Sequence, residues 1–313
     1  MNNLHKPVML NQIKSFIPKT RKINLIDATF GGGGYSKAIL NEFNIDNLIA
    51  IDRDPITKIF ANKIKKEFKN FELINGRFSN IDNIINQTKY KIDKFDIIIF
   101  DLGLSSNQIE NSKRGFSFQK DGPLDMNMGL SKKTAYDVIN NYQEKNLSEI
   151  FFKLGEEKFS KKIARNIVKS RKIKLITTTL ELADIVSKSL PGLLKKKLKI
   201  HPATKTFQAL RIYVNNEMEE LKIALQKSLD LLGKGGFLII VSFQSLEDRI
   251  VKDFFNHNSG KRWRSSRHYP ELADNGPFTL KIITKKPLRP LEEEIKFNPR
   301  SRSAKLRVAQ KIL

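Results

Sequence analysis

Short runs of consecutive apolar residues alternate with amphipathic segments in the first hundred residues. Four such runs lie at 23–30, 47–54, 71–78 and 94–103, and each is followed by polar or helix-like sequence. Runs in which nearly every position is apolar suit strands that are covered on both faces, as in a parallel sheet. The pattern therefore predicts an α/β domain that begins with parallel strands.

The pattern changes after Gly103, where helix-like segments replace the strands up to about Tyr213. From Phe207 to Leu232 the apolar residues recur at spacings of three or four, which is typical of one face of a long helix. We expect this helix to kink near Asn215. The middle of the chain is therefore predicted to be an all-helical insertion.

Strand-like sequence then resumes at 236–243, 278–285 and 305–312. Together with the first four runs, this makes a seven-stranded sheet that is interrupted between its fourth and fifth strands. The predicted division is 1–104 for the first part of the α/β domain, 105–212 for the helical insertion and 213–313 for the second part.

A glycine-rich segment follows the first predicted strand. That strand ends at Asp27, four glycines occupy 31–34, and the second strand ends on a carboxylate at Asp52. Glycine lets the backbone pass close to a ligand, and a carboxylate at the tip of the second strand can accept the hydroxyl protons of a ribose. The segment predicts binding of an adenosine-bearing cofactor.

The glycine spacing bears on which cofactor is bound. The dinucleotide fingerprint G-x-G-x-x-G fails in both registers, because Ser36 or Lys37 stands where the third glycine is needed. The pattern D-x-x-x-G-x-G-G from Asp27 is instead similar to the first motif of class I methyltransferases, which bind S-adenosylmethionine. A glycine-rich turn in an unrelated α/β protein is the alternative interpretation.

The charge of the chain indicates a polyanionic partner. The sequence holds 57 Lys and Arg against 33 Asp and Glu, a formal net charge of +24. Cations that neutralise phosphates release counterions, so RNA or DNA is the obvious candidate. The segment 260–270 places Trp263 among lysine and arginines, a mixture that single-stranded nucleic acid favours. A lysine-rich solvated surface is the alternative.

Several classes of site are excluded by composition. The 313 residues include no cysteine, and the four histidines (His5, His201, His257 and His268) are scattered, so no metal site, disulfide or thiol nucleophile is predicted. No apolar stretch resembles a signal peptide or reaches the length of a membrane span. These features predict a soluble cytoplasmic protein that does not associate with a membrane.

Asp101 ends the fourth predicted strand, at the edge where open α/β sheets bind ligands. Amino-group methyltransferases carry an Asp/Asn-Pro-Pro-aromatic motif at this place, whose acceptors orient the amine. Asp101 with the carbonyls of Leu102 and Gly103 can supply such acceptors, although the Pro-Pro-aromatic part is absent. A carboxylate that only caps a turn is the alternative.

Nine segments, in this order along nearly the whole chain, resemble the bacterial 16S ribosomal RNA cytosine-N(4) methyltransferase family, RsmH or MraW. They are HKPVML (5–10), DATFGGGGYS (27–36), AIDRDP (50–55), DLGLSSNQ (101–108), RGFSFQKDGPLDMNM (114–128), GEEKFSKKIAR (155–165), HPATKTFQALRIYVNNE (201–217), SFQSLEDRIVK (242–252) and NPRSRSAKLR (298–307). The resemblance implies a class I S-adenosylmethionine-dependent methyltransferase: a Rossmann-like, seven-stranded, mostly parallel sheet with an inserted helical substrate domain.

The resemblance also implies a set of cofactor-binding residues. They are Gly33, Gly34, Tyr35, Asp52, Phe78, Asp101 and Gln108. The sequence departs from the family at Tyr35 and Gln244, where histidine is usual. A residue that contributes through its backbone tolerates the change at Tyr35, whereas Gln244 argues against an obligatory proton-shuttling histidine.

For the substrate, the resemblance implies a cytosine in the decoding region of the small ribosomal subunit, which must leave its stack to be methylated. The candidates are Phe116 and Phe118 as stacking surfaces, Asp125 and Asn127 as readers of the base edge, and Lys205, Arg211 and Trp263 for phosphates and stacking. The alternatives are that both phenylalanines are core residues and that His201 only starts a helix.

Three functions are compatible with the sequence: an RNA methyltransferase, a nicotinamide-dependent oxidoreductase, and a basic RNA-binding assembly factor with a vestigial cofactor site. The failed dinucleotide fingerprint and the positive charge disfavour the oxidoreductase. Intact Asp52, Asp101 and Gln108 disfavour the vestigial site. The partner is predicted to be 16S rRNA, naked or within the small subunit, and a monomer and a homodimer both stay open.

Overall fold

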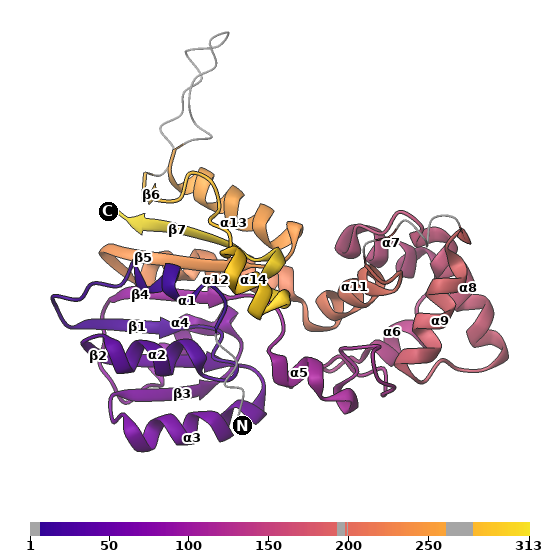
Figure 1. Cartoon of the computed structure of the whole chain (residues 1–313), viewed down its shortest axis with the longest axis horizontal. Coiled ribbons are helices and arrows are strands. Elements are labelled where there is room, and N and C mark those ends of the chain that lie inside the picture. Colours follow the sequence, from indigo (N-terminus) through magenta and orange to yellow (C-terminus); the bar gives the residue numbers. More distant parts are fainter. Residues whose placement is uncertain (1–6, 193–197, 199, 261–277) are drawn as a thin grey trace, which may run out of the picture. The chain divides into compact units, whose positions relative to one another are not determined.

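A computed structural model describes residues 7–192, 198, 200–260 and 278–313 of the chain. The chain divides into two compact units, Met1–Gly103 with Met218–Leu313, and Leu104–Glu217. The first unit is built on a sheet and the second on helices (Figure 1).

The sheet of the first unit has seven strands in the order β3-β2-β1-β4-β5-β7-β6. The strands are β1 (Ile23–Asp27), β2 (Ile45–Asp52), β3 (Phe71–Asn75), β4 (Phe95–Asp101), β5 (Leu232–Ser242), β6 (Leu280–Ile282) and β7 (Lys305–Lys311). Strands β1 to β5 pair in parallel, whereas β7 is antiparallel to both β5 and β6. This topology confirms the predicted class I, Rossmann-like methyltransferase fold. The strand order reverses between β1 and β4, which is where open α/β sheets bind ligands.

Helices cover both faces of this sheet. They are α1 (Leu10–Lys14), α2 (Gly34–Glu42), α3 (Lys58–Glu67), α4 (Ile81–Asn86), α12 (Glu217–Leu231), α13 (Ser245–Asn258) and α14 (Glu292–Phe297). Successive strand residues point to opposite faces, so Leu25 lies in a core with α1, α2 and α3, and Ile26 lies in a second core with α4, α12 and α13. Burial on both faces explains why the centres of strands such as β2 and β4 are apolar at consecutive positions.

The second unit encloses a core of its own. Its helices are α5 (Ser106–Glu110), α6 (Ala135–Asn141), α7 (Glu144–Gly155), α8 (Ser160–Ile173), α9 (Thr179–Ser189) and α11 (Thr204–Asn215). Apolar residues from most of these helices are fully buried together, among them Phe151, Ile163 and Leu210. Capping boxes begin α6 at Thr134 and α9 at Thr178, which satisfies backbone N–H groups that a helix start leaves unpaired.

Several boundaries differ from the predicted ones; β6, for example, spans Leu280–Ile282 instead of 278–285. Three further differences have an identifiable structural cause. The expected kink near Asn215 is a complete break, because Asn216 adopts a left-handed conformation (φ 53°) between α11 and α12. The fifth strand begins at Leu232 instead of 236, since Leu232 pairs with Phe95 of β4 and, after a register shift, Phe237 pairs with Ile97. The helical unit extends to Glu217 instead of 212, because α11 packs into its core as far as Val214.

Within the described part of the chain, no helix combines the length and the apolar character that crossing a membrane requires.

Candidate active site

The glycine loop between β1 and α2 depends on Gly33. This residue is the N-cap of α2 and has a φ of 77°, a conformation that side chains other than glycine rarely adopt. A Cβ atom here would lie 2.7 Å from the Phe30 ring and 2.8 Å from Ile64 Cδ1. Both the backbone angle and the packing therefore require glycine at this position.

Asp27, the last residue of β1, holds the glycine loop in place. Its side chain is fully buried and accepts hydrogen bonds from the Ser36 hydroxyl (2.6 Å) and the Thr29 N–H (3.3 Å). Burial raises the pKa of Asp27 to about 6, although these hydrogen bonds act in the opposite direction. Asp27 is thus a positioning residue that ties the end of β1 to the first turn of α2.

Asp52, at the tip of β2, ties the same loop to the neighbouring strand. One carboxylate oxygen accepts the Gly31 N–H at 2.7 Å, and the other accepts the Asp54 N–H at 2.8 Å. Burial also raises the pKa of Asp52 to about 6. A carboxylate offers about four acceptor sites, so Asp52 keeps capacity for ligand hydroxyl groups beside the glycine loop.

Tyr35 and Phe78 are both held by contacts within the first unit. The Tyr35 side chain is buried, and its hydroxyl donates a hydrogen bond to the Val8 carbonyl, while burial raises its pKa. Phe78 follows β3 and packs edge-on against Phe100, with 5.7 Å between ring centroids. The Tyr35 side chain is thus engaged within the protein, and Phe78 offers a half-buried apolar surface near the strand tips.

Asp101 has the most unusual surroundings in this unit. Its N–H donates to the Thr29 hydroxyl at 2.6 Å, whereas its Oδ1 is buried and has no hydrogen-bond partner among the described residues. Burial raises the pKa of Asp101 well above its usual range, and the charges of Asp27 and Glu247 raise it further. An unpaired buried carboxylate oxygen is costly, which fits a site where a ligand supplies the missing donor.

Two residues that the sequence analysis did not single out, Thr29 and Glu247, interact with Asp101. Thr29 accepts the Asp101 N–H as described, and Glu247 in the first turn of α13 is buried while it accepts the N–H groups of Phe243 (2.9 Å) and Gln244 (3.1 Å). A glutamate at the third position of a helix is a capping signal. That signal was present in the sequence, but its proximity to Asp101 was not.

Gln108, predicted to bind the cofactor, lies in the helical unit. Its side-chain oxygen accepts the Ser105 N–H at 3.1 Å, and Ser105 Oγ accepts the Gln108 N–H at 3.4 Å. This capping box starts α5. The structure thus gives Gln108 a capping role and leaves its place beside a cofactor as a proposal.

The aromatic candidates have different environments. Phe116 is 8% exposed and belongs to the core of the helical unit, which is the alternative considered for it. Phe118 is half-buried and packs against His201 and Phe207, with ring centroids 4.5 and 4.8 Å away. His201 Nδ1 accepts the Ala203 N–H and its carbonyl accepts the Thr204 N–H, so His201 lies in the turn before α11, whose N-cap is Ala203.

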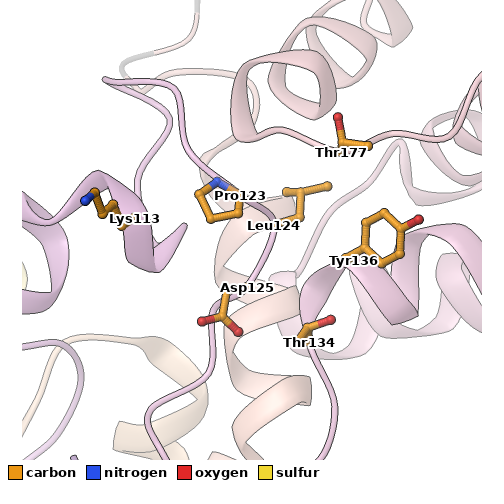
Figure 2. Close-up of a pocket in the computed structure, with 7 residues that line it drawn as sticks. All are labelled: Lys113, Pro123, Leu124, Asp125, Thr134, Tyr136 and Thr177. Atoms are coloured by element: carbon orange, nitrogen blue, oxygen red, sulfur yellow. The ribbon is translucent and has the colours of Figure 1, made fainter.

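Asp125 lines a pocket of about 350 Å³ within the helical unit (Figure 2). The pocket is formed by Lys113, Pro123, Leu124, Asp125, Thr134, Tyr136 and Thr177. Partial burial raises the pKa of Asp125, against the effect of the Asn127 N–H and the charge of Arg114. The Asn127 side chain accepts the Gly129 N–H at 2.6 Å and donates to the Ser131 carbonyl, so it shapes the adjoining loop.

The predicted phosphate contacts have partners within the helical unit. Lys205 donates to the Glu156 carbonyl at 2.9 Å, next to the end of α7. Arg211 forms an ion pair with Glu217 at 2.9 Å, with side chains only 11% and 12% exposed. Trp263 and the basic segment around it lie outside the described residues, as does most of the basic run at 194–199.

Comparison with known proteins gives the family of the chain. Residues 2–312 match the MraW methylase family. The chain belongs to this family. It is 45% identical over 310 residues to the ribosomal RNA small subunit methyltransferase H of Caldicellulosiruptor saccharolyticus, covering 98% of this chain and 99% of the relative. It is 46% identical over 315 residues to the protein of the same name from Rickettsia bellii, with full coverage of both.

Among solved structures, a putative rRNA-methylase from Clostridium thermocellum is similar over 97% of this chain and 95% of that chain, with 12% identity and a TM-score of 0.42. Membership of the MraW methylase family confirms the predicted family and the predicted S-adenosylmethionine-dependent methyltransferase. It also removes the oxidoreductase alternative.

The first unit of this MraW-family methylase has features that fit the cofactor. The glycine loop makes a left-handed turn at Gly33, Asp52 retains acceptor capacity for ribose hydroxyls, and Asp101 has an unpaired buried oxygen. S-adenosylmethionine supplies an electrophilic methyl group on a positively charged sulfur. Carboxylates near the strand tips favour the binding of that charge.

The raised pKa of Asp27 predicts a pH-dependent stability. The neutral carboxyl stabilises the fold fully below its unfolded pKa of 3.8, and this contribution is lost as the pH rises through about 6. Between pH 4 and pH 8 the free energy of unfolding of the wild-type chain should therefore fall by about 2 kcal/mol relative to Asp27→Asn. Urea denaturation of both chains without cofactor measures this difference, and parallel pH profiles would contradict the burial of a titrating Asp27.

Proposed function

We propose that this methyltransferase transfers a methyl group from S-adenosylmethionine to the exocyclic N(4) amine of a cytosine in the decoding region of 16S rRNA. The observation that supports an amine substrate most directly is the buried, unpaired Oδ1 of Asp101 at the tip of β4. The names of the relatives support small-subunit rRNA as the substrate. The net charge of +24 suits binding to RNA phosphates.

Asp101 can compensate for the low nucleophilicity of the N(4) amine. The lone pair of the N(4) amine is conjugated with the ring, so the nitrogen attacks well only when acceptors orient its hydrogens. In the proposed step the nitrogen would form a bond to the methyl carbon while the carbon–sulfur bond breaks and leaves its electron pair on the sulfur, which becomes a neutral thioether. The amine proton would pass to Asp101 and then to water. Burial raises the pKa of Asp101 and makes its carboxylate a better base, while a neighbouring sulfonium charge favours the ionised form.

The helical unit is proposed to contact the base and its neighbours. Asp125 in the pocket of Figure 2 is an acceptor for base amines, and Phe118 offers a partly exposed ring beside His201. Asn127, Lys205 and Arg211 are engaged in contacts within the unit, so we propose that they support this surface more than they touch RNA. Because small ribosomal subunits lie in the cytoplasm, we propose that the enzyme acts there.

The test is transfer of a labelled methyl group to small ribosomal subunits that lack the modification. After nuclease digestion, N(4)-methylated cytidine identified by mass and chromatography supports the proposal. Protein-free 16S rRNA, assayed in parallel, shows whether the substrate must be assembled. Binding of S-adenosylmethionine without label on either RNA, or label on another nucleoside, would contradict the proposed substrate.

A further inference from the structure

Helix α8 of the helical unit has two chemically distinct faces. Its inner face is buried without exposure at Ile163, Ala164 and Ile167. The opposite side carries five exposed cations, named here the α8 basic face: Lys161, Lys162, Arg165, Lys169 and Lys172. At 3.6 residues per turn these five positions fall within a sector of about 100° and a length of roughly 17 Å.

The charges of this face are largely unpaired. Helix α8 contains no acidic residue, and among the described residues only Arg165 of this face approaches a carboxylate, that of Glu144 at 3.6 Å. Other lysines of the unit vary. Lys153 lies 2.9 Å from Glu149, and Lys174 and Lys188 each pair with an acid as well, whereas the exposed Lys145 and Lys158 have no carboxylate partner among the described residues. The α8 basic face is distinguished by five cations that lie together on one side of a helix without an acidic residue.

The position of the first two lysines is also unfavourable for the helix. The N-terminus of a helix carries partial positive charge, so acids stabilise the first turn and cations oppose it. Helices α6, α7 and α9 carry an acid in the first turn, at Asp137, Glu144 and Glu181. Helices α5 and α11 carry none there, and α8 carries none but has two lysines, Lys161 and Lys162. Like charges one turn apart along α8 repel each other as well. Folding alone does not favour this arrangement.

We propose that the α8 basic face binds the phosphate backbone of the RNA substrate. This inference rests on the proposed function and identifies a surface of the helical unit that holds the RNA backbone. Lysines act as point charges that neutralise phosphates without regard to sequence. The contact therefore contributes affinity and orientation, not the choice of cytosine.

The test is the salt dependence of RNA binding by a triple variant, Lys161→Gln with Lys169→Gln and Lys172→Gln. Each lost phosphate contact lowers the slope of log K against log salt by about 0.7 to 0.9. The slope should thus fall by about 2 to 3, and binding of protein-free 16S rRNA at 0.15 M salt should weaken by about 10- to 100-fold. Cofactor affinity should stay unchanged, and the midpoint of thermal unfolding should stay the same or rise, because the variant removes repulsion along α8.

A matched control removes the same number of charges from paired lysines in the same unit: Lys153→Gln with Lys174→Gln and Lys188→Gln. Equal changes in slope for both triple variants would overturn the inference, because net charge alone would then explain them. If the α8 triple variant binds intact subunits more weakly but binds protein-free rRNA as the wild-type chain does, the α8 basic face contacts an acidic protein. That result would also overturn the inference. Absence of methylation by the wild-type chain would instead overturn the proposed function.

Discussion

Replacing Asp101 by asparagine is expected to lower kcat for methyl transfer by about 10²- to 10³-fold, while the Kd for S-adenosylmethionine changes by less than about tenfold. Asparagine keeps the size of the side chain and one acceptor oxygen, but it cannot take up the amine proton or offer a negative charge. Single-turnover transfer of labelled methyl to small subunits, with cofactor binding measured by calorimetry, separates the two effects. Asp46→Asn, at an exposed position on β2, is the control for loss of one charge.

The pH dependence provides an independent check on Asp101. Because the reaction needs the ionised carboxylate, kcat of the wild-type chain should fall as the pH drops through the raised pKa of Asp101, and the variant should lack this limb. The charge of Asp27 helps to raise that pKa. Asp27→Asn should therefore shift the limb to lower pH. An acid limb that persists unchanged in Asp101→Asn would assign it to another group.

The sheet could be predicted because burial on both faces leaves a direct record in the sequence. The centres of strands β1, β2 and β4 are apolar at consecutive positions, since alternate residues enter different cores. Strand β5 was predicted less well at its start. Gly233 and Gly235 indicate a helix stop, yet the strand already begins at Leu232, because the residues on both sides of the glycines, Leu232 and Phe237, pair with β4. Pairing between distant segments is not visible in local sequence.

The break at Asn216 shows a second limit. Apolar spacing continues across it, because α11 and α12 each present an apolar stripe, although α11 packs in the helical core and α12 on the sheet. A single left-handed residue separates them. Hydrophobic periodicity reports which side of a helix is buried but not what buries it. The boundary of the helical unit was therefore placed a few residues too early.

The residues of the candidate site also differ in how far they could be predicted from the sequence. Asp52 and Asp101 could be located because parallel strands bring their carboxyl ends to one edge. The surroundings of Arg211 could not be predicted from the sequence. Its ion-pair partner Glu217 lies beyond the helix break, and the burial of Arg211 depends on how the chain packs there. Phe116 is a single apolar residue in a loop, for which no periodicity distinguishes a core position from a stacking surface. Functional residues at the ends of parallel strands can be predicted from the order of the strands along the chain. The contact partners of side chains in the helical unit cannot be predicted in this way.

Replacing Asp52 by alanine is expected to raise the Kd for S-adenosylmethionine by about 10²-fold or more. Hydrogen bonds from ribose hydroxyls to a carboxylate contribute about 1.5 to 3 kcal/mol each. The variant also releases the Gly31 N–H, which Asp52 holds at 2.7 Å, so the glycine loop loses its tie to β2. Isothermal titration calorimetry measures the Kd, and the Asp46→Asn variant should bind like the wild-type chain.

Affinity should also depend on pH through this residue. Without ligand the pKa of Asp52 is about 6, and hydroxyl donors favour the charged form, so the pKa falls on binding. Binding therefore releases a proton below about pH 6, and the Kd rises as the pH is lowered, by up to about tenfold per unit. Asp52→Asn keeps the size of the side chain but cannot titrate, so its Kd should vary less between pH 5 and pH 7.5. If the Kd of both chains varies equally with pH, the titrating group is not Asp52. The weaker cofactor binding of Asp52→Ala would then come from the altered glycine loop alone.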